Sequence, residues 1–438
     1  MNEIESLLDL KNRLLIFNNI REKHIFQVFE DLLYTLKEVK TDKSIIDSYY
    51  KFSSEIIEYG ESTGIIDNIN PWQAFILNFL LEDENIFTHQ IENNSYINLG
   101  LSLKNAVKND LSVLENFYRI DCEKLKIWVE NSLKTSRVKL PEWNKVTRNK
   151  SKWNYRKNKF IKFMNNNVDW KKYIENLAEF YQKNGTGILN SFKVFKWNNG
   201  LKGLVNVDDI TFSNLIGYEN QIKQVKKNTE KLLNKNRANN ILLYGEKGTG
   251  KSSTVKAVVN EYWHKGLRLI ELEKDDFSGF NEIINRLNNS SLCFILFIDD
   301  LSFSEKEHGY RELKAILEGR TQLLPENVVI YATSNRRHLV KENFSNGENN
   351  IRKQDSIQEK LSLADRFGIT LIYTAPTQKE YIKIVKALAD QRDLPINTED
   401  LIDRAKKWEK KQNGRSGRTA RQFIDYIEGE LNMENGIY

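Results

Sequence analysis

The sequence has little proline and little cysteine for its length, with 5 prolines, 2 cysteines and 5 histidines among 438 residues. Scarce proline together with 40% hydrophobic residues argues against a disordered chain and favours compact, largely helical domains. Cys122 and Cys293 lie in different regions, and Cys293 stands inside the apolar run "LCFILFI", so a buried thiol is expected rather than a disulfide. The histidines show no metal-ligand spacing, so no structural zinc is expected.

A long apolar segment is also missing. No run approaches the roughly 20 apolar residues that cross a bilayer. The opening "MNEIESLLDLKNRLL" carries charges throughout instead of a basic end followed by an apolar region. These absences predict a cytoplasmic protein with no membrane contact.

Positive charge is concentrated in one segment. Residues Lys134 to Lys172 hold 13 lysines and arginines against 2 acidic residues, which more than accounts for the net charge of +6. The interleaved aromatic residues are Trp143, Trp153, Tyr155, Phe160, Phe163 and Trp170. One hypothesis is a nucleic-acid contact, since cations neutralise phosphates and aromatic rings stack on bases. The alternative is a solvated charged face whose aromatic residues pack a helix against the rest of the chain.

The first part of the chain has a helical pattern. Up to residue 133, apolar residues recur at three- and four-residue steps, as in "IESLLDLKNRLLIFNNI" and "PWQAFILNFLLEDE", which predicts an all-helical N-terminal domain. For one helix, Asn70 is a suitable cap and Pro71 a suitable first residue. Residues 134–204, which contain the basic segment, are predicted to form a basic, aromatic linker region.

The pattern changes in the second half. From residue 205 to 376, short apolar runs such as "ILLY", "LCFILFI" and "NVVIYATS" alternate with amphipathic helical patterns. This alternation predicts an α/β core, a mostly parallel sheet with helices on both faces. Residues 377–438 return to helical patterns only, which predicts a small C-terminal helical subdomain.

The stretch "GEKGTGKS" matches G-x-x-x-x-G-K-[ST] and stands between a predicted strand and a predicted helix, the context of a phosphate-binding loop. Its glycines let backbone N–H groups point at an anion, and the helix start adds partial positive charge. Lys251 is predicted to reach the β- and γ-phosphates of ATP, and the Ser252 hydroxyl to ligate Mg²⁺. A glycine-rich turn with an incidental lysine is the alternative. The predicted nucleotide-binding residues of the loop are Gly245, Glu246, Lys247, Gly248, Thr249, Gly250, Lys251, Ser252 and Ser253.

Two acidic residues follow the most apolar predicted strand, in "LCFILFIDD". Ligands of a doubly wound sheet gather at the carboxyl ends of its strands. Asp299 is therefore predicted to bind Mg²⁺, through water, and Asp300 to polarise the attacking water. The alternative is a strand that runs into an acidic turn.

These motifs, in this order, resemble the AAA+ ATPase superfamily. The segments "FIDDLSF", "YATSNRRHLV", "LSLADRFG" and "GRSGRTARQF" resemble a bacterial AAA+ family catalogued as domain-of-unknown-function family 815, over roughly residues 205 to 430. The resemblance implies an AAA+ P-loop core with a helical lid. It also implies that Ile216 and Gly217 in "FSNLIGYENQ" lie near the adenine. Asn335 matches the sensor-1 position, whose amide orients the attacking water or the γ-phosphate; capping a helix over "RRHLVKE" is a compatible second role.

The same resemblance implies roles for three arginines. Arg366 matches the arginine finger that is presented to the ATP of a neighbouring subunit, which makes a homo-oligomer expected; a planar guanidinium suits charge spread over phosphoryl oxygens. A local surface pair of Asp365 with Arg366 is the alternative. Arg421 fits the sensor-2 position of the lid best, and Arg418 is the other register.

One departure from the family pattern bears on function. Most AAA+ proteins have glutamate after the metal-binding aspartate, whereas this chain has Asp300, which is one methylene shorter, so slow hydrolysis is expected. Two classes of function follow. The first is an oligomeric ATPase that remodels or loads a macromolecular partner. The second is an ATP-dependent switch that binds a protein or nucleic-acid partner without motor activity.

Overall fold

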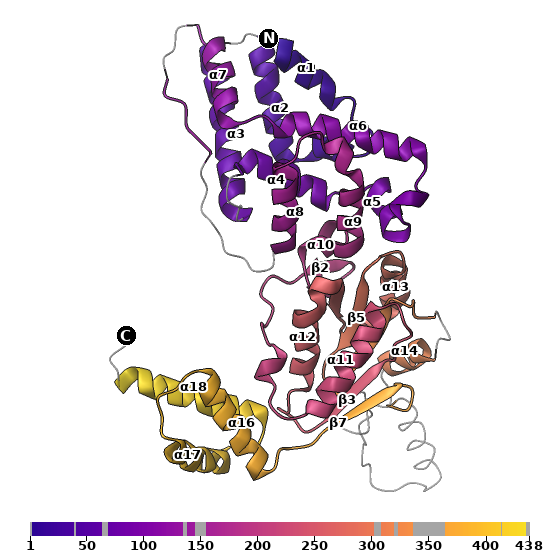
Figure 1. Cartoon of the computed structure of the whole chain (residues 1–438), viewed down its shortest axis with the longest axis vertical. Coiled ribbons are helices and arrows are strands. Elements are labelled where there is room, and N and C mark those ends of the chain that lie inside the picture. The colour runs from indigo at the N-terminus through magenta and orange to yellow at the C-terminus, as the bar shows by residue number, and fades with distance from the viewer. Residues whose placement is uncertain are drawn as a thin grey trace. The chain divides into compact units, whose positions relative to one another are not determined.

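The computed structural model describes residues 2–38, 41–63, 69–134, 138–144, 155–301, 308–318, 323–335, 364–412 and 414–434. The chain forms two compact units, Met1–Ser191 and Phe192–Tyr438 (Figure 1). Within the described residues, no helix combines the length and the apolar character that crossing a membrane requires.

The first unit is helical, as predicted. Its α-helices and short 3₁₀ helices (η) are α1 (Asn2–Lys11), η1 (Asn18–Glu22), α2 (His24–Lys37), α3 (Asp42–Thr63), α4 (Pro71–Glu82), α5 (Ile86–Asn93), η2 (Tyr96–Asn98), α6 (Leu101–Tyr118), α7 (Cys122–Ser132), α8 (Tyr155–Asn165), η4 (Trp170–Tyr173), α9 (Ile174–Asn184) and α10 (Gly187–Ser191). The predicted start of α4 is confirmed, since the Asn70 side chain accepts the backbone N–H of Gln73 at 2.8 Å and Pro71 is the first helical residue. Trp72 lies at the centre of the core, with its ring centroid 4.3 Å from that of Phe29.

The first helix is shorter than its apolar pattern predicts. It ends at Lys11, because the buried carboxylate of Asp110 accepts the backbone N–H groups of Leu15, Ile16 and Phe17 at 2.7–3.1 Å. These three donors are then unavailable to a continuing helix. A contact between residues almost one hundred positions apart thus overrides the local pattern.

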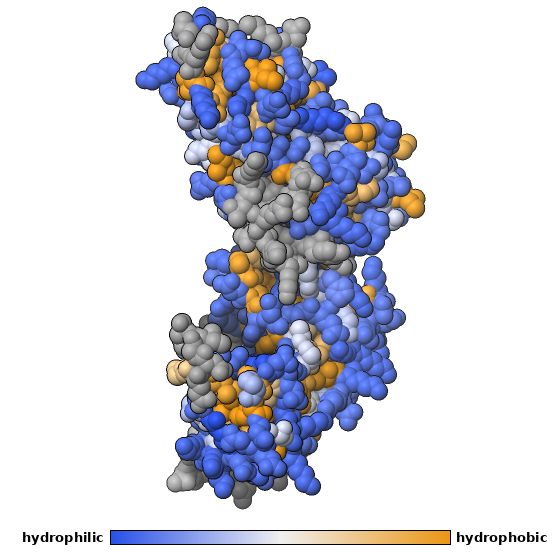
Figure 2. All heavy atoms as spheres, turned by 60° about the vertical axis from the view of Figure 1, so that its left-hand side comes forward, coloured by the Kyte–Doolittle hydropathy of each residue, from blue (hydrophilic) through white to orange (hydrophobic). Residues whose placement is uncertain are grey.

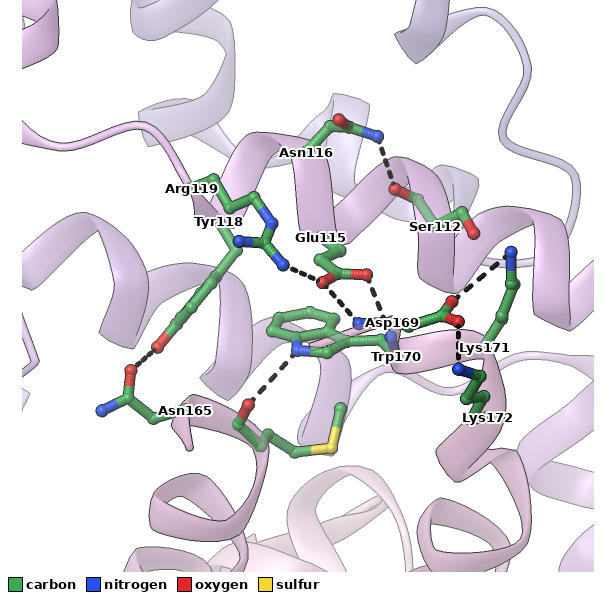
Figure 3. A network of polar contacts seen from close by, with 11 residues as sticks. Ser112, Glu115, Asn116, Tyr118, Arg119, Asn165, Asp169, Trp170, Lys171 and Lys172 are labelled. Atoms are coloured by element: carbon green, nitrogen blue, oxygen red, sulfur yellow. Dashed lines mark hydrogen bonds and ion pairs between the residues drawn. The ribbon is translucent and has the colours of Figure 1, made fainter. Parts of the chain in front are cut away.

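The predicted linker region differs most from the structure, because residues 155–191 belong to the first unit. Figure 3 shows how they are held: the Glu115 carboxylate on α6 accepts the backbone N–H of Asp169 at 2.8 Å and that of Trp170 at 2.9 Å. The guanidinium of Arg119 lies 2.5 Å from the same carboxylate. Asp169 adopts a left-handed backbone conformation (φ 65°), so this turn depends on its hydrogen bonds.

The aromatic residues of the basic segment are largely buried in this helical core. Trp143 and Trp170 are each 1% exposed, and Phe160 and Phe163 pack against the core. Several cations are paired as well: Lys157 lies 2.5 Å from Glu82, and Lys171 and Lys172 lie 3.4 and 3.0 Å from Asp169 (Figure 3). Trp143 and Trp170 are too buried to stack on bases, and Phe160 and Phe163 are partly buried against the core, so the packing alternative is favoured for these four. Trp153 and the side chains of Tyr155 and Arg156 lie outside the described residues.

Replacing Glu115 by alanine is expected to lower the free energy of unfolding of the first unit by about 2–4 kcal/mol, because one buried and one partly buried backbone N–H group lose their acceptor. Chemical denaturation followed by circular dichroism measures the loss. The exposed Glu130→Ala is the matched control and should change stability by less than about 0.5 kcal/mol. Equal stability of the two variants would show that Glu115 does not anchor the segment.

The second unit contains the sheet and the C-terminal helices. Its elements are β1 (Val194–Trp197), β2 (Leu201–Gly203), η5 (Phe212–Asn214), α11 (Glu219–Leu233), β3 (Ile241–Gly245), α12 (Lys251–Tyr262), η6 (Trp263–Lys265), β4 (Leu267–Glu271), η7 (Lys274–Gly279), α13 (Phe280–Asn288), β5 (Cys293–Ile298), α14 (His308–Leu317), β6 (Val328–Ser334), β7 (Ile369–Tyr373), α16 (Gln378–Gln391), α17 (Thr398–Lys411) and α18 (Gly417–Glu434). The strand order is β2-β1-β4-β5-β6-β3-β7. Apart from the antiparallel pair β1–β2, neighbouring strands are parallel, which confirms the predicted α/β core.

The sheet begins earlier than residue 205. The hairpin of β1 and β2 was expected to lie in the linker region, but β1 pairs in parallel with β4, and so it extends the core sheet. At the centre, every residue of β5 and β6 is buried, as expected for strands covered on both faces. Cys293, the first residue of β5, is a buried free thiol, as predicted, and so is Cys122.

The three C-terminal helices form the lid, as predicted, and Figure 1 shows them gathered after β7 (yellow). They have a small apolar core of their own, which includes Tyr381, Val385, Ala405 and Phe423. The lid contacts the core domain directly, since the side-chain amide of Gln391 donates to the carbonyl of Ser213 at 2.6 Å. Figure 2 shows hydrophilic residues (blue) over most of the visible face, with smaller groups of apolar residues (orange) among them.

Candidate nucleotide-binding site

The glycine-rich loop connects β3 to α12, the arrangement that its sequence predicts. Gly245 has φ 139°, and a Cβ placed there would lie 2.0 Å from the carbonyl oxygen of Tyr373 in β7. Only glycine fits this close approach. Gly250, with φ 94°, directly precedes Lys251, the first residue of α12. The loop therefore curls around the start of the helix, where unpaired N–H groups attract an anion.

Lys251 is 6% exposed. Its Nζ donates to the carbonyl oxygens of Gly245 at 2.9 Å and Glu246 at 2.8 Å, and to Oδ1 of Asn335 at 3.0 Å. Burial lowers the pKa of the Lys251 ammonium, and the carboxylates of Asp300 and Asp299 act against that shift. The ammonium is thus held at the loop, beside the two acidic residues.

The two aspartates follow the last residue of β5, as predicted, and both are exposed. Oδ1 of Asp299 accepts the Ser252 hydroxyl at 2.6 Å, so the phosphate loop and the acidic turn are in direct contact. Asp300 has φ 51°, a left-handed conformation that few non-glycine residues adopt. Strained backbone of this kind persists only where neighbouring groups support it.

Asn335 follows β6, which lies between β5 and β3 in the sheet. Its amide nitrogen donates to Oδ1 of Asp300 at 2.7 Å, while its amide oxygen accepts from Lys251. The carboxylate of Asp300, the amide of Asn335 and the ammonium of Lys251 thus form one chain of hydrogen bonds. Capping of a following helix by Asn335 concerns residues 336–363, which lie outside the described residues.

Thr333, near the end of β6, was not predicted as a site residue. Its hydroxyl donates to Oδ1 of Asp299 at 2.5 Å and accepts the backbone N–H of Asp300 at 2.9 Å. With these bonds the network closes from Lys251 through Asn335, Asp300, Thr333 and Asp299 to Ser252. The available signal was proximity to the end of the strand, since Thr333 stands two residues before Asn335.

This network faces a cavity of about 520 Å³, a volume within the range of ligand pockets. The loop from Lys247 to Ser253 lines it, together with Asp299, Asp300 and Asn335. Ile216 also lines it, and packs against the apolar core of the lid; Gly217, with φ 83°, is not among the lining residues. The apolar residues that line the cavity include Leu215 and Ile216 before α11 and Ile384 and Leu388 of α16.

Both candidate lid arginines line the cavity. The backbone N–H of Arg418 donates to the carbonyl of Gly248 in the phosphate loop at 3.2 Å. The Arg418 guanidinium also lies close enough to Lys251 to contribute to its lowered pKa, after burial. Arg421 is one helical turn further along α18. The geometry therefore places Arg418 beside the loop, although the sequence favours Arg421.

Arg366 is absent from the cavity lining among the described residues. It forms an ion pair with Glu318, at the end of α14, rather than with Asp365. Glu318 is 7% exposed and Arg366 is 31% exposed, so the guanidinium is partly accessible while its partner is buried. No motif in the sequence points to Glu318, so this partner of Arg366 was not predicted.

The residues present fit a magnesium ion. Ser252 and Asp299 supply oxygen ligands that are already in contact, and Mg²⁺ is commonly held by one or two protein groups plus substrate phosphates. Within the described parts of the chain, no group of three or more His, Cys, Asp or Glu residues is placed to hold a metal. Ser252 and Asp299 would leave the other coordination positions of such an ion to phosphate oxygens and water.

The model of the family described as Protein of unknown function (DUF815) matches residues 190–431, more than half of the chain. No curated protein matches the chain. Similar solved structures include a RuvB variant of Thermotoga maritima, with 19% identity and TM-score 0.36, covering 52% of this chain and 66% of that chain. PCH-2 of C. elegans has 18% identity and TM-score 0.33, covering 50% and 70%. A chain of the HORMA:CdnC:Trip13 complex of E. coli MS115-1 has 14% identity and TM-score 0.33, covering 49% and 89%.

Proposed function

This chain belongs to the family described as Protein of unknown function (DUF815), and from that premise we propose that its second unit is an AAA+ nucleotide-binding core that binds and hydrolyses Mg-ATP. The observation that carries the proposal is the closed network joining Lys251 and Ser252 to Asp299, Asp300 and Asn335 at one edge of the sheet. Phosphate-binding, metal-binding and water-orienting groups meet there around one cavity, as phosphoryl transfer requires.

Each group has a role that its position supports. Lys251 and the loop N–H groups hold the β- and γ-phosphates, and Ser252 and Asp299 hold Mg²⁺. A Mg²⁺ ion held by Ser252 and Asp299 would neutralise negative charge that develops on the phosphates. Asp300 accepts a hydrogen bond from the attacking water, which Asn335 orients. The apolar end near Ile216 receives the base, and Arg418 and Arg421 report phosphate occupancy to the lid.

Arg366 acts across a subunit interface in this proposal, which makes the protein an oligomer. To reach the γ-phosphate of a neighbour, its guanidinium exchanges the Glu318 carboxylate for phosphoryl oxygens. Both partners are anionic and suit the planar donor fork of arginine. The ion pair therefore holds the Arg366 side chain in one position until the phosphates of a neighbouring nucleotide replace Glu318 as its partner.

The oligomer couples its nucleotide state to remodelling or loading of a macromolecular partner. If the partner is a nucleic acid that binds Lys134–Lys172, the lysines and arginines of this segment make most of the contact. Four of its aromatic rings are packed in the helical core instead. A protein partner is the other candidate. One observation favours the second function, a slow nucleotide switch: the short Asp300 side chain is already bonded to Asn335.

Lys251→Ala tests nucleotide binding. The affinity for ATP is expected to fall at least 100-fold, because phosphate charge loses a desolvated, charge-assisted donor. Isothermal titration calorimetry measures the dissociation constant. Lys247→Ala removes a positive charge from an exposed position of the same loop and should weaken binding by less than about 10-fold. Equal affinities for both variants would argue against the assigned phosphate site.

A further inference from the structure

Thr333 lies at the centre of the site, although no role was predicted for it within the segment "YATSNRRHLV". The side chain is 1% exposed and ends at the turn that carries both aspartates. A threonine hydroxyl has one proton to donate and lone pairs to accept with. Since the Asp299 carboxylate can only accept, the proton goes to Oδ1 of Asp299, and the N–H of Asp300 donates to the oxygen of Thr333.

The first consequence concerns the orientation of Asp299. Its Oδ1 accepts two hydroxyl groups, from Ser252 at 2.6 Å and from Thr333 at 2.5 Å. Oδ1 also accepts the backbone N–H of Asp300 at 3.2 Å, and these donors together set the rotation of the carboxylate. Groups that orient a metal-binding side chain typically change metal affinity by 10–100-fold when they are lost.

The second consequence concerns the backbone of Asp300. Its left-handed conformation (φ 51°) is unfavourable in a non-glycine residue and needs support from neighbouring groups. Thr333 supports it from two sides, because the hydroxyl accepts the N–H of Asp300 and the Thr333 carbonyl accepts the N–H of Leu301 at 2.6 Å. The same conformation brings Oδ1 of Asp300 within 2.7 Å of the Asn335 amide.

We propose that Thr333 is a positioning residue, whose single hydroxyl fixes the metal-binding carboxylate of Asp299 and the backbone conformation of Asp300 together. The inference rests on the proposed function, since it concerns Mg-ATP. Thr333 touches neither phosphate nor water in this account. It acts only through the two aspartates, so its loss should change the Mg²⁺ dependence of the site rather than its metal-free affinity for ATP.

Thr333→Val tests the proposal, because valine keeps the shape and removes the hydroxyl. The Mg²⁺ concentration that gives half-maximal enhancement of ATP binding is expected to rise at least 10-fold, measured by calorimetry over a Mg²⁺ series. ATP affinity in EDTA should not change. Thr333→Ser should restore the wild-type Mg²⁺ dependence. Thr229→Val removes another buried hydroxyl, on α11, and controls for a general loss of stability.

The possible results distinguish the positioning role of Thr333 from the proposed function. If wild type binds ATP with a Mg²⁺ dependence that Thr333→Val leaves unchanged, the positioning role is overturned and the proposed function stands. If wild type shows no Mg²⁺ dependence at all, both are overturned. Should the valine variant fail to fold, Thr333→Ala also removes the hydroxyl and is judged by the same criterion against Thr333→Ser.

Discussion

Arg366→Ala is expected to lower the ATP turnover rate by about 10³-fold or more at saturating ATP, while the affinity for ATP stays unchanged. An arginine supplied to a phosphoryl-transfer site contributes roughly 10³–10⁵ in rate, and in this account it reaches the ATP of a neighbouring chain. Steady-state phosphate release measures turnover, and calorimetry measures affinity. Arg404→Ala, which breaks another arginine–glutamate ion pair of the second unit, is the control and should leave turnover unchanged.

Mixing variants tests whether Arg366 acts between chains. Arg366→Ala keeps an intact nucleotide site, and Lys251→Ala keeps an intact Arg366. A mixture of the two inactive proteins should therefore regain part of the activity. No recovery, together with full association of the chains, would place the role of Arg366 within its own subunit.

Stability must be separated from turnover in this comparison. Because Glu318 is buried, Arg366→Ala deprives its carboxylate of this cation, which lowers stability by itself. The double variant Arg366→Ala/Glu318→Gln removes the charge of both partners. It should recover thermal stability without recovering turnover. Recovery of turnover would assign Arg366 a purely structural role.

The second large effect is expected for Asp300→Asn, with turnover lowered by about 10²–10⁴-fold and Mg-ATP affinity retained. The amide keeps the shape and still accepts from Asn335, but it cannot accept a proton from water, and general-base contributions are of that size. Phosphate release under single-turnover conditions measures the chemical step. Asp300→Glu restores the side chain that most AAA+ proteins carry there, and it should keep or raise the rate. Unchanged turnover in Asp300→Asn would show that Asp300 takes no part in the chemical step.

Much of the site could be predicted because most of its functional residues stand in short, continuous sequence motifs. The loop from Gly245 to Ser253, the acidic pair after β5 and Asn335 after β6 each stand directly at the end of a predicted element. Parallel strands bring their carboxyl ends to one edge, so these groups meet once the fold is known. The α/β core and the lid followed from the same alternation of patterns.

The unpredicted contacts depend on which elements lie side by side. Thr333 reaches Asp299 only because β6 is the neighbour of β5, and Glu318 meets Arg366 across 48 positions of sequence. The basic segment also depends on a distant contact. Nothing in the sequence near Asp169 indicates that the carboxylate of Glu115, 54 positions earlier, accepts its backbone N–H. The sequence of this segment is compatible both with packing of its aromatic residues and with a nucleic-acid contact. Only tertiary packing decides between these alternatives.

The turnover rate per chain against protein concentration, for wild type and Asp300→Asn, tests the central claim most directly. The account predicts that the wild-type rate rises with concentration, as Arg366 of one chain reaches the ATP of another, and that Asp300→Asn stays near zero throughout. A wild-type rate that is negligible at every concentration, despite tight Mg-ATP binding, would contradict hydrolysis and leave the nucleotide switch.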